Sequence, residues 1–176
     1  MRFLKYAAIA ILLWLTVGCA NTKFYAFGVD INDLAKAKPA DYGELALGVV
    51  ASTATHVAGH YIAAELADVD IHQEGMAEII DGYETKSGVR WFARSGFLLE
   101  LGVNTMLIEL YPDAYFTKGY TMMSTIRYVT YNIRNTDAND FKCLDRFDGN
   151  GNFEHTLYGA WVTYNFLRLS IQEKKE

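Results

Sequence analysis

Two histidines, His56 and His60, are the side chains whose type and spacing suit metal chemistry best. They are four residues apart in a segment with helical periodicity, so both imidazoles lie on one helix face and can reach the same ion. Imidazole nitrogen is a ligand for zinc and for iron, so a Zn or Fe site is one interpretation of the pair. The alternative is that both histidines are polar residues of a packed helix face, hydrogen-bonded to neighbouring carboxylates or hydroxyls.

The segment around Thr55 to His60 resembles the His-Glu-x-x-His helix of membrane-associated zinc metallopeptidases. The resemblance implies that His56 and His60 are metal ligands. It does not imply catalysis, because the glutamate that acts as general base in that family is replaced here by Val57. Glu65 is a poor substitute base, because a position five residues after His60 is turned about 140 degrees around the helix.

A zinc site of this kind needs a third protein ligand. The sequence offers several candidates and does not choose among them: His72, His155, Glu74, Glu100, Glu109 and Glu154. We retain His155 as the candidate third ligand beside His56 and His60. No nucleophile elbow, P-loop, dinucleotide fingerprint or Cys-x-x-Cys motif is present in the sequence, which favours a non-enzymatic role.

The elements that must position these histidines are helices. The hydrophobic periodicity predicts an all-α fold, a compact bundle of four or five antiparallel helices joined by short connections. Helices are predicted over residues 43–66, 73–83, 89–111, 114–133 and 153–171, and a polar loop over 135–152. Asp41 and Glu44 have the spacing of a capping box, so Asp41 is expected to cap the first helix.

The N-terminus has the pattern of a secretory signal. Arg2 and Lys5 supply a positive region, residues 7–15 form an apolar run, and Gly18 precedes Cys19. The apolar run is short for a transmembrane helix. The first residues are therefore expected to direct export.

The tetrapeptide Thr16-Val17-Gly18-Cys19 resembles the lipobox of bacterial lipoproteins, although Thr16 stands where leucine is usual. The resemblance implies cleavage before Cys19 and attachment of acyl chains such as palmitate to that residue, which anchors a domain without spanning the membrane. The predicted organisation has three parts: a signal peptide (1–18), a lipidated N-terminus and linker (19–40), and a helical domain (41–176).

The net charge and the cysteine content are compatible with an exported, lipid-anchored protein. The formal net charge is -5 and becomes -7 once Arg2 and Lys5 leave with the signal, so no nucleic-acid partner is expected. Cys143 is the only other cysteine, so no internal disulfide can form once Cys19 carries lipid. The expected location is the cell envelope, on the periplasmic side of an outer membrane or, without one, on the outer face of the cytoplasmic membrane.

Three functions follow from these patterns. The first is an extracytoplasmic, membrane-anchored lipoprotein with a structural or interaction role, for which the abundant aromatic residues suit an envelope protein partner. The second is a metal-binding helical domain that uses the His56/His60 pair, with hydrolysis as one activity such a site could support. The third is a polytopic membrane protein, because residues 45–64 are nearly long and apolar enough to span a bilayer.

Overall fold

The structure is a computed structural model that describes residues 25–27, 29–74, 77–81, 86–133, 140–148 and 152–172. The predicted signal peptide, the lipobox and Cys19 lie outside the described residues.

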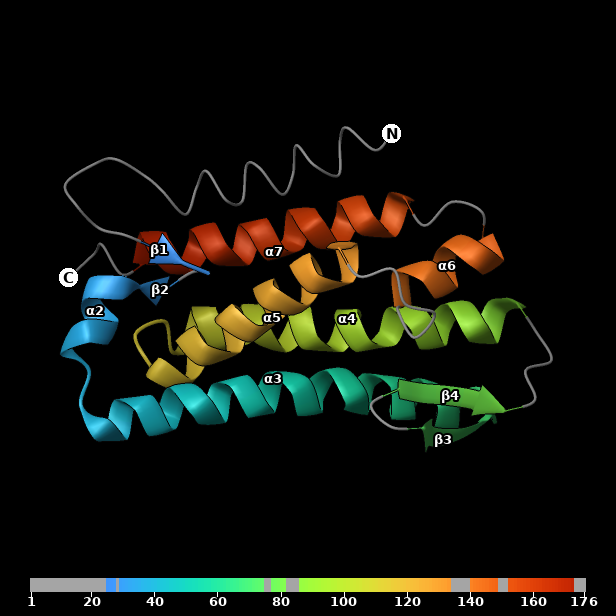
Figure 1. Ribbon diagram of the computed structural model, residues 1–176. Helices are drawn as coiled ribbons and strands as arrows, with labels where there is room; N and C mark the ends of the chain where they lie inside the picture. Colours follow the sequence, from blue (N-terminus) through green and yellow to red (C-terminus); the bar gives the residue numbers. More distant parts are fainter. Residues whose placement is uncertain are drawn as a thin grey trace.

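Four long helices carry the fold, with two short helices and two small hairpins added in the described part of the chain (Figure 1). In chain order the elements are β1 (Tyr25–Ala26), β2 (Val29–Asp30), α2 (Ile31–Lys36), α3 (Pro39–Leu66), β3 (Asp70–Glu74), β4 (Ala77–Asp81), α4 (Lys86–Leu110), α5 (Tyr115–Ile133), α6 (Asp140–Asp148) and α7 (Asn152–Gln172). α3 packs on α4 and α5, and α7 packs on the same two helices from another side. The predicted all-α helical bundle is confirmed.

α3 starts earlier than predicted and is capped differently. Lys38 is the N-cap residue, and Pro39 follows at the first helical position, where its missing N–H would have had no partner. The carboxylate of Asp41 accepts the backbone N–H of Lys38 at 2.7 Å. The prediction that Asp41 is the N-cap was wrong, because Asp41 takes the inner position of the box that had been assigned to Glu44.

Residues 70–74 and 77–81 pair as antiparallel strands, so the predicted helix over 73–83 is wrong at its described residues 73–74 and 77–81. Strands β3 and β4 pair in register, with Ile71 opposite Ile80. Branched isoleucine side chains favour strands, and Gly75, between the two strands in sequence, disfavours a helix. A helix of eleven residues would also have been marginal without strong propensity, so strand pairing prevails.

The polar stretch 135–152 contains α6, so the predicted loop is wrong over 140–148. Phe141 and Leu144 lie one turn apart on α6, and both are about 1% exposed in the core cluster that also contains Phe97. Burial of two such side chains contributes roughly 1.5–3 kcal/mol each, which can hold a short helix that is unstable alone. Because the apolar face of α6 is small and the residues around it are polar, the sequence pattern indicated a loop here.

Helices α3 and α5 approach each other closely, because a glycine on each faces the backbone of the other. A Cβ added to Gly48 would lie 2.0 Å from the carbonyl oxygen of Phe116. A Cβ added to Gly119 would lie 2.0 Å from the carbonyl oxygen of Leu45. This approach brings the polar side chains of α5 next to those of α3.

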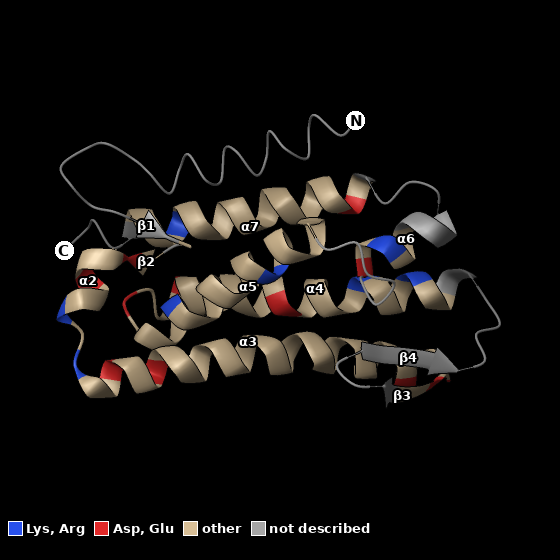
Figure 2. Ribbon diagram, in the orientation of Figure 1, with Lys and Arg blue, Asp and Glu red and all other residues tan. Residues whose placement is uncertain are grey.

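The charged and apolar side chains are distributed unusually for a helical bundle. Between Glu44 and Glu65, α3 has no Asp, Glu, Lys or Arg, and Figure 2 shows the middle of this helix as an uncharged ribbon. Glu100 on α4 and Arg127 on α5 are instead buried inside the bundle. Large apolar side chains are exposed on α3 and α7: Leu47, Val50, Ile62, Leu66, Phe153, Leu157, Leu167 and Ile171. Among the described helices, none combines the length and the apolar character needed to cross a membrane.

Candidate metal centre

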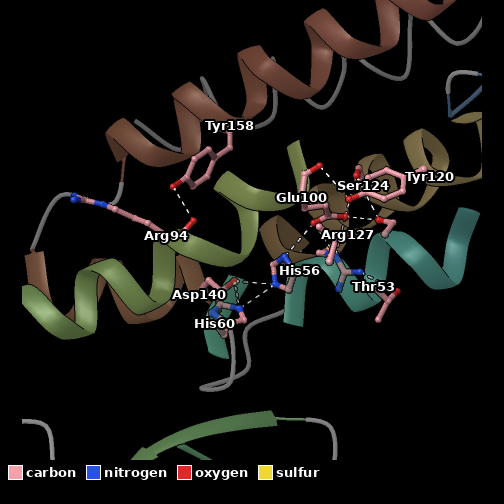
Figure 3. A network of polar contacts seen from close by, with 12 residues as sticks. Thr53, His56, His60, Arg94, Glu100, Tyr120, Ser124, Arg127, Asp140 and Tyr158 are labelled. Atoms are coloured by element: carbon pink, nitrogen blue, oxygen red, sulfur yellow. Dashed lines mark hydrogen bonds and ion pairs between the residues drawn. The ribbon is translucent and has the colours of Figure 1, made fainter. Parts of the chain in front are cut away.

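Three side-chain atoms from two helices converge inside the bundle (Figure 3). His56 Nε2 lies 3.2 Å from His60 Nε2 and 3.2 Å from Asp140 Oδ2. His60 Nε2 lies 3.5 Å from the same carboxylate oxygen. Both histidines are about 2% exposed and Asp140 is 12% exposed, so the three atoms form a nearly equilateral, sheltered triangle.

The opposite nitrogen of each imidazole is fixed by a strong acceptor. His60 Nδ1 lies 2.8 Å from the backbone oxygen of Phe92, which can only accept, so Nδ1 carries the proton. His56 Nδ1 lies 3.0 Å from Glu100 Oε2, and an ionised carboxylate likewise only accepts. In neutral imidazoles held this way both Nε2 atoms are unprotonated and present a lone pair. Three electron-rich atoms then face one another, and their repulsion is relieved either by a metal ion or by a proton shared between them.

The carboxylate oxygen of the triangle, Asp140 Oδ2, has no hydrogen-bond donor of conventional geometry among the described residues. This oxygen is buried, although it lies 3.2 Å from His56 Nε2. A buried carboxylate oxygen without a well-aligned donor is costly, so its partners are the charge of a protonated imidazole or of a metal ion.

The backbone of α4 makes room for both rings at Gly96. A Cβ added to Gly96 would lie 2.5 Å from His60 Nε2 and 2.8 Å from His56 Cε1. Gly59, between the two histidines on α3, is equally close to α4: its Cβ would lie 2.5 Å from the carbonyl oxygen of Ser95. Two glycines thus allow the imidazoles to lie directly against the backbone of α4.

Glu100 is the hub of a buried polar network behind His56 (Figure 3). Its carboxylate accepts hydrogen bonds from Ser52 Oγ at 2.5 Å and Ser124 Oγ at 2.9 Å, and pairs with Arg127 Nε at 3.1 Å. Burial would raise the pKa of Glu100, but the hydrogen bond with His56 and the charge of Arg127 outweigh burial and hold it below its usual range. The carboxylate therefore stays ionised and anchors His56.

In the metal-free protein a proton occupies part of this site. Burial would lower the pKa of His56, but Asp140 on one ring nitrogen and Glu100 on the other raise it to about 9. Burial would raise the pKa of Asp140, whereas the neighbouring His60 and His56 hold it well below its usual range. Asp140 is therefore an anion, and His56 is the group that balances it without an ion.

The other candidate ligands lie outside the triangle. His155 Nδ1 lies 3.1 Å from Asn132 Oδ1, and its ring packs on Phe141 at a centroid distance of 4.0 Å. Among the described residues, the converging set is His56, His60 and Asp140 and does not include His155.

Three of the four candidate carboxylates have described side chains, and none of these three contributes an oxygen to the triangle. Glu109 is exposed and pairs with Arg168, and Glu154 pairs with Arg94. Glu100 contacts His56 at Nδ1, on the side of the ring opposite the triangle. His72 lies in β3 and is exposed, and the side chain of Glu74 lies outside the described residues.

Asp140 was not among the candidate ligands derived from the sequence. It is the first residue of α6, in the stretch expected to be a loop. The spacing of Asp140, Phe141 and Leu144, an acidic residue followed by an apolar pair one turn apart, is the signal that could have indicated a helix start there.

The chain matches no protein-family model, and comparisons with curated proteins and with solved structures gave no match either. The function is therefore inferred from the geometry of the site.

Proposed function

We propose that this protein binds one divalent transition-metal ion, with zinc as the first candidate, through His56 Nε2, His60 Nε2 and Asp140 Oδ2. The observation that carries the proposal is the triangle of 3.2, 3.2 and 3.5 Å. A tetrahedral ion with bonds of about 2.0 to 2.1 Å holds its ligand atoms about 3.3 Å apart. The three atoms therefore already have the mutual spacing that such an ion requires.

The surroundings of the ligands support the same proposal. Metal-bound histidines usually donate their second ring N–H to a carboxylate or a backbone carbonyl, which fixes the tautomer and the ring orientation. His56 has Glu100 in that role and His60 has the Phe92 carbonyl. Once a metal displaces the proton on His56, both rings can direct an Nε2 lone pair at the ion together with the Asp140 carboxylate.

Three protein ligands leave a fourth position for water or another small ligand, which is the arrangement of catalytic rather than structural zinc sites. Two histidines and one carboxylate also form the facial set used by non-haem iron. Iron is therefore the second candidate ion. Val57 still lies where a metallopeptidase helix has its glutamate, so the proposal is metal binding and does not include peptidase activity.

The test is metal analysis of the full chain, purified without a His-tag, beside three variants. We expect about one equivalent of zinc or iron per chain, lost in His60→Gln and in Asp140→Asn. His155→Gln is the matched control, because His155 is also a buried histidine but lies outside the triangle. The proposal fails if the folded wild-type chain binds no divalent ion tightly, or if His60→Gln retains it.

We also propose that the chain is a lipoprotein attached to the cell envelope through Cys19. The lipobox-like Thr16-Val17-Gly18-Cys19 supports this, and the exposed apolar side chains of α3 and α7 suit contact with lipid or with an envelope protein. Labelling of cells with a palmitate analogue should modify the wild-type chain and not Cys19→Ser. Equal labelling of Cys19→Ser, or no labelling of either, would refute the anchor without affecting the metal site.

A further inference from the structure

The charges around the triangle determine what the fourth ligand of the metal should be. Besides the two histidines, the ionic contacts at the site involve Asp140 on α6, Glu100 on α4 and Arg127 on α5 among the described residues. Arg127 pairs directly with Glu100, so these two charges compensate each other. With both histidines neutral, Asp140 leaves the protein side of the centre with one net negative charge.

A divalent ion adds two positive charges to the site. The loaded centre, consisting of the ion, Asp140, Glu100 and Arg127, carries one net positive charge. His56 and Glu100 are at most 2% exposed, so water screens this excess charge poorly. The ion's own charge thus dominates the local electrostatics.

We propose that the loaded centre takes a small monoanion as its fourth ligand. In water this ligand is hydroxide, formed when a bound water gives one proton to the solvent, and a carboxylate or a similar monodentate anion can replace it. The inference rests on the proposed metal site. It identifies the class of ligand or substrate group that the centre recognises, which is a singly charged oxygen or nitrogen donor.

Burial favours a neutral total at the loaded site, and one bound anion neutralises its single excess positive charge. The Ser52 and Ser124 hydroxyls donate hydrogen bonds to Glu100, so they help to keep that carboxylate ionised when the anion binds. The anion therefore binds to the metal side and does not replace the Glu100 network.

The experiment is a titration of the cobalt(II)-loaded full chain with azide, followed by its visible absorption. Cobalt(II) reports the number and type of its ligands, so binding of azide in the fourth position should change the spectrum and saturate as binding to a single site. Three variants set the charge of the loaded centre without altering a metal ligand. Arg127→Gln lowers the charge to zero, Glu100→Gln raises it to two, and Glu100→Gln with Arg127→Gln restores one.

The affinity for azide should increase with the net positive charge of the loaded centre. We expect about a tenfold change per unit, as estimated for charges about 10 Å apart at an effective dielectric constant of about 20. Glu100→Gln should bind azide most tightly, wild type and the double variant should bind it similarly, and Arg127→Gln should bind it most weakly. The double variant separates charge from packing, because it lacks both side chains and keeps the wild-type charge.

Two results would overturn the inference: a cobalt spectrum that does not respond to azide, or affinities that do not follow the charge of the centre. Failure of the metal site itself looks different, because none of the proteins would then show a bound-cobalt spectrum before azide is added.

Discussion

Gly96 lies directly against His60: a Cβ on Gly96 would be 2.5 Å from His60 Nε2, the nitrogen proposed to bind metal. The contact joins the backbone of α4 to a side chain of α3 at the centre of the bundle. The site therefore depends on a missing side chain as much as on the side chains that are present.

Gly96→Ala should displace the His60 imidazole and weaken metal binding by at least tenfold, as well as destabilise the fold by about 1–3 kcal/mol through overpacking. Gly102→Ala is the matched control, because Gly102 lies on the same helix and an added Cβ would meet nothing within 4 Å. That variant should gain up to about 1 kcal/mol from better helix propensity. Metal titration and urea unfolding measure both effects, and equal metal affinity in the two variants would contradict the proposed role of Gly96.

Glu100→Gln should lower metal affinity by about 10–100-fold, because loss of an outer carboxylate partner typically has this effect on a ligating histidine. The amide can no longer act as a charged acceptor for His56 Nδ1. Glu109→Gln, on the same helix but exposed and paired with Arg168, should leave the affinity unchanged. Competition with a chromophoric chelator measures the affinities, and a matching loss in Glu109→Gln would mean that Glu100 has no special role.

The stability of the metal-free protein should decrease as the pH rises above neutrality. The pKa of His56 is raised from 6.5 to about 9 in the folded state. A raised pKa stabilises the fold fully below pH 6.5, and this contribution disappears as the pH rises through 9, with a size of about 3 kcal/mol. Urea unfolding in EDTA between pH 6 and pH 9.5 should show the decrease.

Removing the titrating group provides the control for this pH dependence. His56→Gln should lack most of the decrease, whereas His155→Gln should retain it. A wild-type stability that stays flat over this range would show that His56 does not carry the proton. Metal affinity should change in the opposite direction, increasing with pH, because the ion must displace that proton.

Gly119→Ala should destabilise the protein, because its Cβ would lie 2.0 Å from the carbonyl oxygen of Leu45 and would push α5 away from α3. We expect a loss of about 1–3 kcal/mol, with larger values if the helices cannot separate. Gly43→Ala on α3 meets nothing within 4 Å and serves as the control. Thermal unfolding of both variants measures the difference, and similar midpoints would show that the close helix approach is not required.

Much of the fold could be predicted from the sequence, because the long helices have strong hydrophobic periodicity. The predictions over 43–66, 89–111, 114–133 and 153–171 differ from α3, α4, α5 and α7 by only a few residues, the largest difference being at the start of α3. The short elements were predicted wrongly. In β3–β4 and α6, pairing with another strand or burial against the core determines the structure, and neither is visible in a window of about ten residues.

By itself, the sequence determined that His56 and His60 lie on one helix face, because a spacing of four residues needs only local helix geometry. Only the tertiary structure decided that Asp140 and not His155 lies beside them, and that Glu100 stands behind His56. Asp140 follows His60 by eighty positions, and its place depends on burial of Phe141 and Leu144 against α4. Contacts between segments so distant in the chain arise from packing of the whole bundle, which local residue patterns do not encode.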